Sequence, residues 1–106
     1  MQFSSTANLC RLKVEIEFER ADFKCANKRE FEALCRSAVR QVLGEAAPQF
    51  QVEKEFVVGT QTGAVIFEAS HLNKLWASLS VFGHYLGSNL AIRMKEVRVH
   101  VFGAQL

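Results

Sequence analysis

The sequence predicts a single α+β domain whose elements follow the order β-α-β-β-α-β. Three observations support this prediction: a strictly alternating segment near the start, two segments with apolar residues at helical spacing, and strand-like runs between and after them. In this order the first and third strands lie centrally in a four-stranded antiparallel sheet. Both helices then cover one face of the sheet, and the other face stays open.

The chain has 106 residues, of which 49% are hydrophobic and 23% charged, as in an ordinary folded domain. Residues 1–8 are small and polar, so we expect a flexible N-terminal arm and a single domain over residues 9–106. The net charge of +2 does not by itself indicate nucleic acid, although residues 69–106 hold four basic and one acidic residue. We expect neither a membrane segment nor a secretory signal.

Alternation predicts the first strand and its two faces. Apolar residues take one parity: Cys10, Leu12, Val14, Ile16 and Phe18. Polar residues take the other parity: Arg11, Lys13, Glu15, Glu17 and Glu19. Such a period of two predicts one buried face and one wet face.

The first helix is predicted to begin after Asn27, a favourable N-cap, with Glu30 three residues later as in a capping box. Gly44 suits the C-cap, and Pro48 prevents continuation of the helix. The apolar stripe consists of Phe31, Leu34, Cys35, Ala38, Val39 and Val42. Its 3.6-residue period predicts packing on the sheet.

A second strand is predicted over residues 50–58, then a turn over 59–63, then a third strand over 64–69. The third strand is apolar on both parities, which predicts a strand covered on both faces. One parity holds Ala64 and Ile66, and the other holds Val65 and Phe67.

The second helix is predicted to begin at Ser70 as N-cap and to end at Gly83. Its core face, which includes the tryptophan, consists of Leu72, Leu75, Trp76 and Leu79. After a turn at residues 87–89, the last strand changes apolar parity between Met94 and Val97, which predicts a β-bulge near Lys95–Glu96. The complete order predicts a ferredoxin-like sandwich, the topology that RNA recognition modules share.

The chemistry-bearing residues form no catalytic motif. The sequence contains no phosphate-binding glycine loop, no HExxH and no GxSxG, and His71, His84 and His100 are far apart. The three cysteines lack the spacing of metal ligands and fit a reducing compartment. Cys10 and Cys35 fall on apolar faces, whereas Cys25 falls in a polar loop where it can be exposed. We therefore expect no catalytic residue, no cofactor and no metal site.

RNA recognition modules stack bases on aromatic rings of their first and third strands, and the polar parity of this first strand carries no ring. Contact with RNA would then be made to phosphates. The candidates are Arg11, Lys13, Arg93 and Lys95. An ordinary solvated sheet face explains the same residues equally well.

The doubly apolar third strand predicts a protein contact on the open face, because exposed apolar patches usually mark interfaces. Either Val65 and Phe67 or Ala64 and Ile66 would form it, and Phe82 and Tyr85 would extend it. Alternatively, residues 1–8 or 102–106 fold over the sheet.

The stretch TGAVIFEA followed by KLWASLSVFGHYLG resembles the small protein subunits of eukaryotic ribonuclease P and ribonuclease MRP, the family of the Pop-five and fourteen-kilodalton subunits. The fourteen-kilodalton type is the more similar of the two. The matching positions are Lys74, Leu75, Trp76, Ser78, Leu79, Gly83, Tyr85 and Gly87. The likeness covers roughly residues 10–100, and its motifs are packing motifs.

The resemblance implies a nuclear and nucleolar RNA-binding ribonucleoprotein that removes the 5′ leader of precursor tRNA, in which RNA carries the catalysis. It implies a non-catalytic scaffolding subunit whose partners are a Pop-five-type paralogue, a TIM-barrel subunit of about thirty kilodaltons and the enzyme's RNA.

Two other functions fit the predicted topology. One is a stand-alone interaction domain that self-associates through its open sheet face and forms a dimer in isolation. The other is an acylphosphatase-like enzyme, which needs a glycine-rich loop with an arginine after the first strand. Residues 20–27 contain Arg20 but no glycine, so this function is the less favoured.

Overall fold

The computed structural model describes residues 8–101. The N-terminal arm predicted for residues 1–8 therefore lies outside the described residues, except for Asn8, which is the first residue of a strand. Residues 102–106 also lie outside them.

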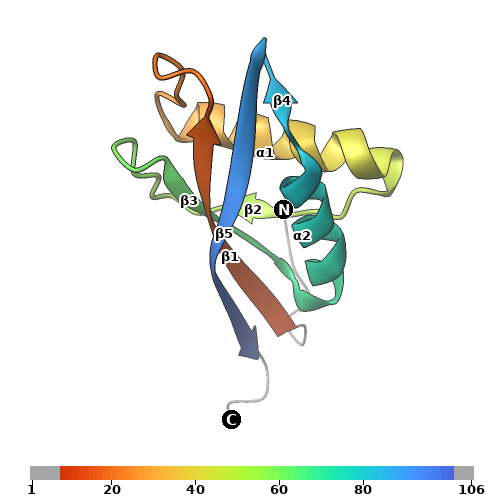
Figure 1. Ribbon diagram of the computed structural model, residues 1–106. Helices are drawn as coiled ribbons and strands as arrows, with labels where there is room; N and C mark the ends of the chain where they lie inside the picture. Colours follow the sequence, from red (N-terminus) through yellow and green to blue (C-terminus); the bar gives the residue numbers. More distant parts are fainter. Residues whose placement is uncertain (1–7, 102–106) are drawn as a thin grey trace.

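Two helices and five strands make up the described part of the chain (Figure 1). The elements are β1 (Asn8–Phe18), α1 (Lys28–Leu43), β2 (Gln51–Val52), β3 (Thr62–Glu68), α2 (Leu72–Val81), β4 (His84–Tyr85) and β5 (Ser88–Val101). The strands form one antiparallel sheet in the order β2-β3-β1-β5-β4. The α+β prediction is thus confirmed, but the predicted count of four strands is wrong because β4 adds a fifth.

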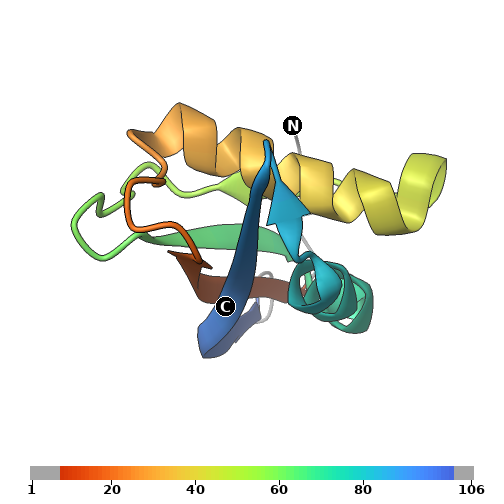
Figure 2. The same cartoon turned by 45° about the horizontal axis from the view of Figure 1, so that its top comes forward.

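β1 is the central strand, and it pairs with β3 on one side and β5 on the other. Its even-numbered residues are buried: Cys10, Leu12, Val14 and Ile16. They form one core with residues of both helices, and Figure 2 shows α1 crossing the strands with α2 beside it. The odd-numbered residues from Arg11 to Glu15 are half-buried, and Glu17 is exposed on the other face. The predicted alternation is therefore confirmed.

α1 begins and ends where its capping residues predict. The Asn27 Oδ1 accepts the Glu30 N–H at 3.0 Å, and the Glu30 carboxylate accepts the Ala26 N–H at 2.8 Å. Gly44 at the C-cap has φ of 57°, a conformation that favours glycine. Val42, predicted as part of the buried stripe, is 45% exposed in the last turn.

β2 is much shorter than the predicted strand over residues 50–58. Glu53 still donates its N–H to the Ala64 carbonyl at 2.9 Å, and after it the chain leaves the sheet. The ring of Phe56 then stacks on the ring of Phe31 with centroids 4.8 Å apart. Only Val57 returns, in an isolated bridge to Thr62. Packing of Phe56 on α1 therefore outweighs continued strand pairing here.

α2 begins later than predicted. A 3-10 turn over Ala69–His71 precedes it, and no side chain caps its first turn. Ser70 is exposed within that turn, so the prediction of Ser70 as N-cap is wrong. The helix ends at Val81, followed by Phe82 and Gly83.

The predicted bulge in β5 is confirmed. Lys13 pairs with Glu96 and Val14 with Met94, so Lys95 is an extra residue opposite β1. The bulge explains the change of parity, because the apolar residues on both sides of it stay on the helix side of the sheet.

Gln61 joins two loops that the sequence leaves unconnected. Its side-chain oxygen accepts the Cys25 N–H at 2.7 Å, and its amide nitrogen donates to the carbonyls of Cys25 and Val58 at 2.9 and 2.8 Å. This holds the loop after β1 against the turn before β3. No motif predicts such a role for a single glutamine.

Gly63 on β3 lies directly against the ring of Phe31. A Cβ built at this position would lie 2.6 Å from Cε2 of Phe31, closer than real Cβ contacts. Gly63→Ala should therefore lower the free energy of unfolding by about 1–3 kcal/mol, because Phe31 must shift within a packed core. Urea unfolding followed by circular dichroism measures the change.

Gly59→Ala is the matched control, since nothing lies within 4 Å of a Cβ there. Equal stabilities of the two variants would contradict the close packing of β3 on α1.

Candidate interaction surfaces

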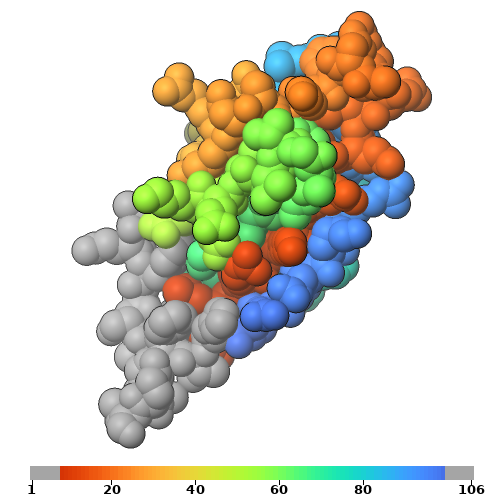
Figure 3. Space-filling view, turned by 90° about the vertical axis from the view of Figure 1, so that its left-hand side faces the viewer, coloured from red at the N-terminus to blue at the C-terminus, as the bar shows by residue number. Residues whose placement is uncertain are grey.

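The open face of the sheet carries the four residues predicted to contact RNA phosphates. Arg11 and Lys13 lie on β1, and Arg93 and Lys95 lie on β5. Figure 3 shows residues of β1 (red) between green and blue segments that include β3 and β5. The structure thus brings the predicted cations to neighbouring strands.

Carboxylates on the same face pair with most of these cations. The Arg93 Nε lies 3.1 Å from a carboxylate oxygen of Glu17, and the Lys95 Nζ lies 3.8 Å from one of Glu15. Lys13 has no ion pair with another described residue. Phosphate binding by the paired residues would require exchange of a carboxylate for a phosphate, and phosphate contact stays a prediction.

Arg11 is the most constrained of the four. Its guanidinium binds both carboxylate oxygens of Glu53, at 2.6 and 2.9 Å, and contacts Glu96 at 3.5 Å. The hydrogen bonds from Arg11 lower the pKa of the Glu53 carboxyl and raise that of Arg11. This bidentate pair joins β1 to the segment after β2 and leaves Arg11 engaged within the molecule.

Val65 and Phe67, predicted as the centre of a partner surface, face the helices. They pair with Leu12 and Cys10, and both side chains are 0% exposed. The prediction is therefore wrong for these two residues. The alternative pair, Ala64 and Ile66, faces the open side beside Lys13 and Arg11. Ala64 is 1% exposed, so little apolar surface is open there.

The hairpin of β4 and β5 places an apolar residue at its tip. Phe82 is buried and Tyr85 half-buried, with their rings 5.9 Å apart, so the predicted extension is mostly packed inside. The two-residue turn is Leu86–Gly87, not residues 87–89 as predicted. Leu86 has φ of 50° and is 72% exposed.

A small cavity of about 220 Å³ lies beside this hairpin. The rings of Phe18, Phe23 and Tyr85 contribute to its lining, together with Leu86 and Cys25. The hairpin tip therefore combines a projecting apolar side chain with an adjacent apolar recess.

Trp76 is not a core residue, contrary to the prediction, because 41% of it is exposed. At about 100° per residue, Trp76 and Ser78 lie on opposite flanks of the line through Leu75 and Leu79. Ser78 is fully buried, and α2 packs against α1. We infer that the Ser78 flank faces α1 and that the Trp76 flank faces outward.

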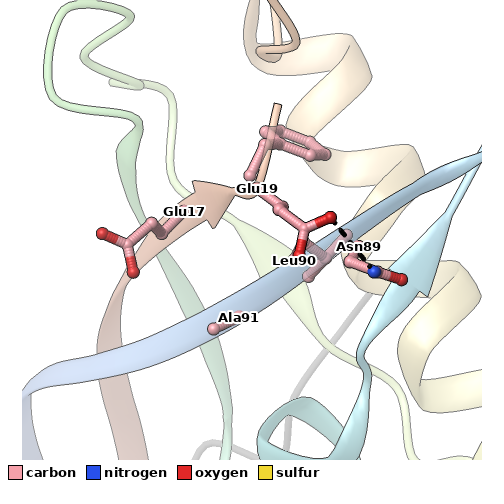
Figure 4. A pocket seen from close by; sticks show the side chains of 6 residues that line it. Glu17, Glu19, Asn89, Leu90 and Ala91 are labelled. Carbon is pink, nitrogen blue, oxygen red and sulfur yellow. Dashed lines mark hydrogen bonds between the residues drawn. The ribbon is translucent and has the colours of Figure 1, made fainter. Parts of the chain in front are cut away.

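A second hollow of about 400 Å³ lies where the end of β1 meets the start of β5. Figure 4 shows Glu17 and Glu19 pointing apart, and Glu19 accepts a hydrogen bond from Asn89 at 3.3 Å. The two carboxylates therefore do not form the close pair that shares a proton. Among residues 8–99, no three His, Cys, Asp or Glu side chains are placed to hold a metal ion.

The three cysteines are all buried as free thiols, including Cys25, which the sequence places in a polar loop. Burial raises the pKa of Cys25 to about 11 and also raises that of Cys10 and Cys35. At neutral pH these thiols stay protonated, as packing groups do. No described helix is long and apolar enough to span a membrane.

Neither a scan against protein-family models nor a search of curated proteins finds a match to the chain.

The Glu53–Arg11 pair predicts a pH dependence. Folding lowers the pKa of the Glu53 carboxyl. The ion pair therefore stabilises the fold at pH values above the ordinary glutamate pKa, and this stabilisation is lost as pH falls through the folded-state pKa. Glu53→Gln should therefore be less stable than the unmodified chain at neutral pH, and the difference should shrink in acid. Urea unfolding at several pH values measures it, with exposed Glu45→Gln as the control.

The same variant tests phosphate contact. If Arg11 binds phosphates once it is released, Glu53→Gln should elute from heparin at higher salt than Glu45→Gln, although both remove one negative charge. Identical elution would remove Arg11 from the candidate RNA contacts.

Proposed function

We propose that the chain is a non-catalytic protein subunit of the ribonuclease P and ribonuclease MRP type, which scaffolds assembly for 5′ maturation of precursor tRNA. The observation that carries the proposal is the exposed, conformationally unfavourable Leu86. It lies inside the family-like stretch, between Tyr85 and Gly87.

Leucine is a poor choice for the position it occupies. Both turn residues have positive φ, at 50° and 83°, and this hairpin turn favours Asn and Gly. A leucine there costs about 1 kcal/mol, and its side chain stays in water. A residue that weakens the fold and exposes apolar surface fits a role in contact with another molecule.

The outward flank of α2 supports the same proposal. Trp76, at a position of the resemblance, contributes less to the core than the sequence predicts and offers a large aromatic surface. Tryptophan is enriched among the residues that dominate binding energy at protein interfaces.

The strand order of the sheet also supports the proposal. Without the two-residue β4, the strand order β2-β3-β1-β5 is that of a ferredoxin-like sheet. This order supports a fold related to RNA recognition modules. The resemblance of residues 62–87 is the ground for proposing partners of the Pop-five and TIM-barrel subunit types and residence in the nucleus and nucleolus.

The two competing functions gain no support. Self-association through the open face depended on exposed apolar residues, and Val65 and Phe67 are buried. An acylphosphatase-like site needs a glycine-rich loop with an arginine after the first strand, and residues 20–27 contain no glycine. The arginine there, Arg20, pairs with Asp22 at 2.8 Å.

Purification of the endogenous protein at moderate salt tests the proposal. A large RNA and precursor-tRNA cleavage activity should accompany it. Recovery of the protein with neither one would refute the proposal.

Leu86→Asn separates folding from assembly. The variant should be more stable by roughly 0.5–1 kcal/mol, because Asn tolerates the left-handed conformation. It should nevertheless recover less RNA and less cleavage activity when it replaces the endogenous protein. Urea unfolding and co-purification measure the two effects.

Val42→Gln is the control, since Val42 is also exposed but lies at the end of α1. A Leu86→Asn variant that assembles normally would remove the hairpin tip from the partner surface.

A further inference from the structure

The outer edge of β5 is free over most of its length. β5 pairs with β1 from Leu90 to Val101, but on its other side β4 reaches only Ser88 and Asn89. Beyond these two residues, no strand of the described chain lies along that edge. A free edge of this length favours the addition of another strand.

Hydrogen bonds show which backbone groups point outward. Glu19 N–H donates to the Asn89 carbonyl at 2.9 Å, whereas Leu90 N–H donates away from β1, to the Gly83 carbonyl at 3.0 Å. Before the bulge, even-numbered residues of β5 therefore turn their N–H and C=O groups outward. The extra residue Lys95 reverses this parity. After the bulge, the N–H and C=O groups of Val97 and Val99 therefore point outward.

The side chains at this edge are also suited to a contact. Val97 and Val99 are 37% and 53% exposed, although they belong to the apolar parity of β5. Glu96 and Arg98 alternate with them on the open face, in register with Lys13 and Arg11. Within the chain the Arg98 Nε lies 3.3 Å from a carboxylate oxygen of Glu96, so pairing across two copies exchanges this contact for one between copies. The edge thus has alternate apolar and oppositely charged residues.

We propose that two copies of this chain pair through the free edge of β5, antiparallel and centred on Val97. The two sheets then become one continuous sheet. In this register Glu96 of each copy lies opposite Arg98 of the other, and the two Val97 residues exchange their outward N–H and C=O groups. This inference is independent of the proposed ribonucleoprotein function.

Charge selects this register among the symmetric ones. A centre on Arg98 would place two arginines opposite each other, and a centre on Glu96 would place two glutamates opposite each other. Only the centre on Val97 gives two opposite-charge pairs, which stabilise neighbouring strands, while like charges destabilise them. It also matches the outward direction of the Val97 backbone groups.

Sedimentation velocity of the full chain at low ionic strength, over about a hundredfold range of concentration, tests the proposal. We expect a monomer–dimer equilibrium that weakens with added salt. Arg98→Glu should weaken dimerisation about tenfold or more, because two like-charge pairs replace two opposite-charge pairs. Arg29→Glu, on exposed α1 surface, is the charge-matched control and should leave dimerisation unchanged.

Mixing provides the sharper test. Glu96→Arg and Arg98→Glu should each associate poorly alone, whereas an equimolar mixture should form a heterodimer with both charge pairs restored. Circular dichroism and urea unfolding of each variant confirm that it folds.

A chain that stays monomeric at all concentrations would overturn the proposal. Variants that dimerise normally, or that gain nothing on mixing, would likewise overturn it.

Discussion

The fold depends on the alternation of β1. This strand pairs with β3 and β5 at once, so its even-numbered residues fix which side chains of both neighbours face the helices. A shift of one residue would bring Arg11 and Lys13 into the core. The free-energy cost of burying these charges fixes the register of β1 with β3 and with β5. The helices, the open charged face and the free edge of β5 all follow from this one strand.

Elements with strong local patterns could be predicted from the sequence. β1, the cap of α1 at Asn27 and the bulge at Lys95 each depend on neighbouring residues, and the structure has all three. The shortened β2 could not be predicted, because its end is set by the stacking of Phe56 on Phe31, two residues far apart in the chain. Tertiary packing decides such boundaries.

The candidate site was predicted less well, for a physical reason. A strand that is apolar on both parities carries no information on which parity faces the helices, so Val65 and Phe67 could be placed on either side. Helical spacing likewise places Trp76 near the core face without stating how far the neighbouring helix reaches. The pairing of Arg11 with Glu53 joins segments 42 residues apart and has no local pattern. The Leu86–Gly87 turn did contain a signal, since glycine in a two-residue hairpin turn is common.

The pairing of β1 with β5 also bears on how the chain folds during synthesis. The first strand made pairs with the last one, whose partner residues come 72 to 93 positions later, so the sheet has many contacts between distant parts of the chain. Such topologies fold slowly, because the loop must close before the contacts stabilise it. Until β5 leaves the ribosome, one edge of β1 has no partner strand, and a nascent chain in that state is open to aggregation or to binding by chaperones.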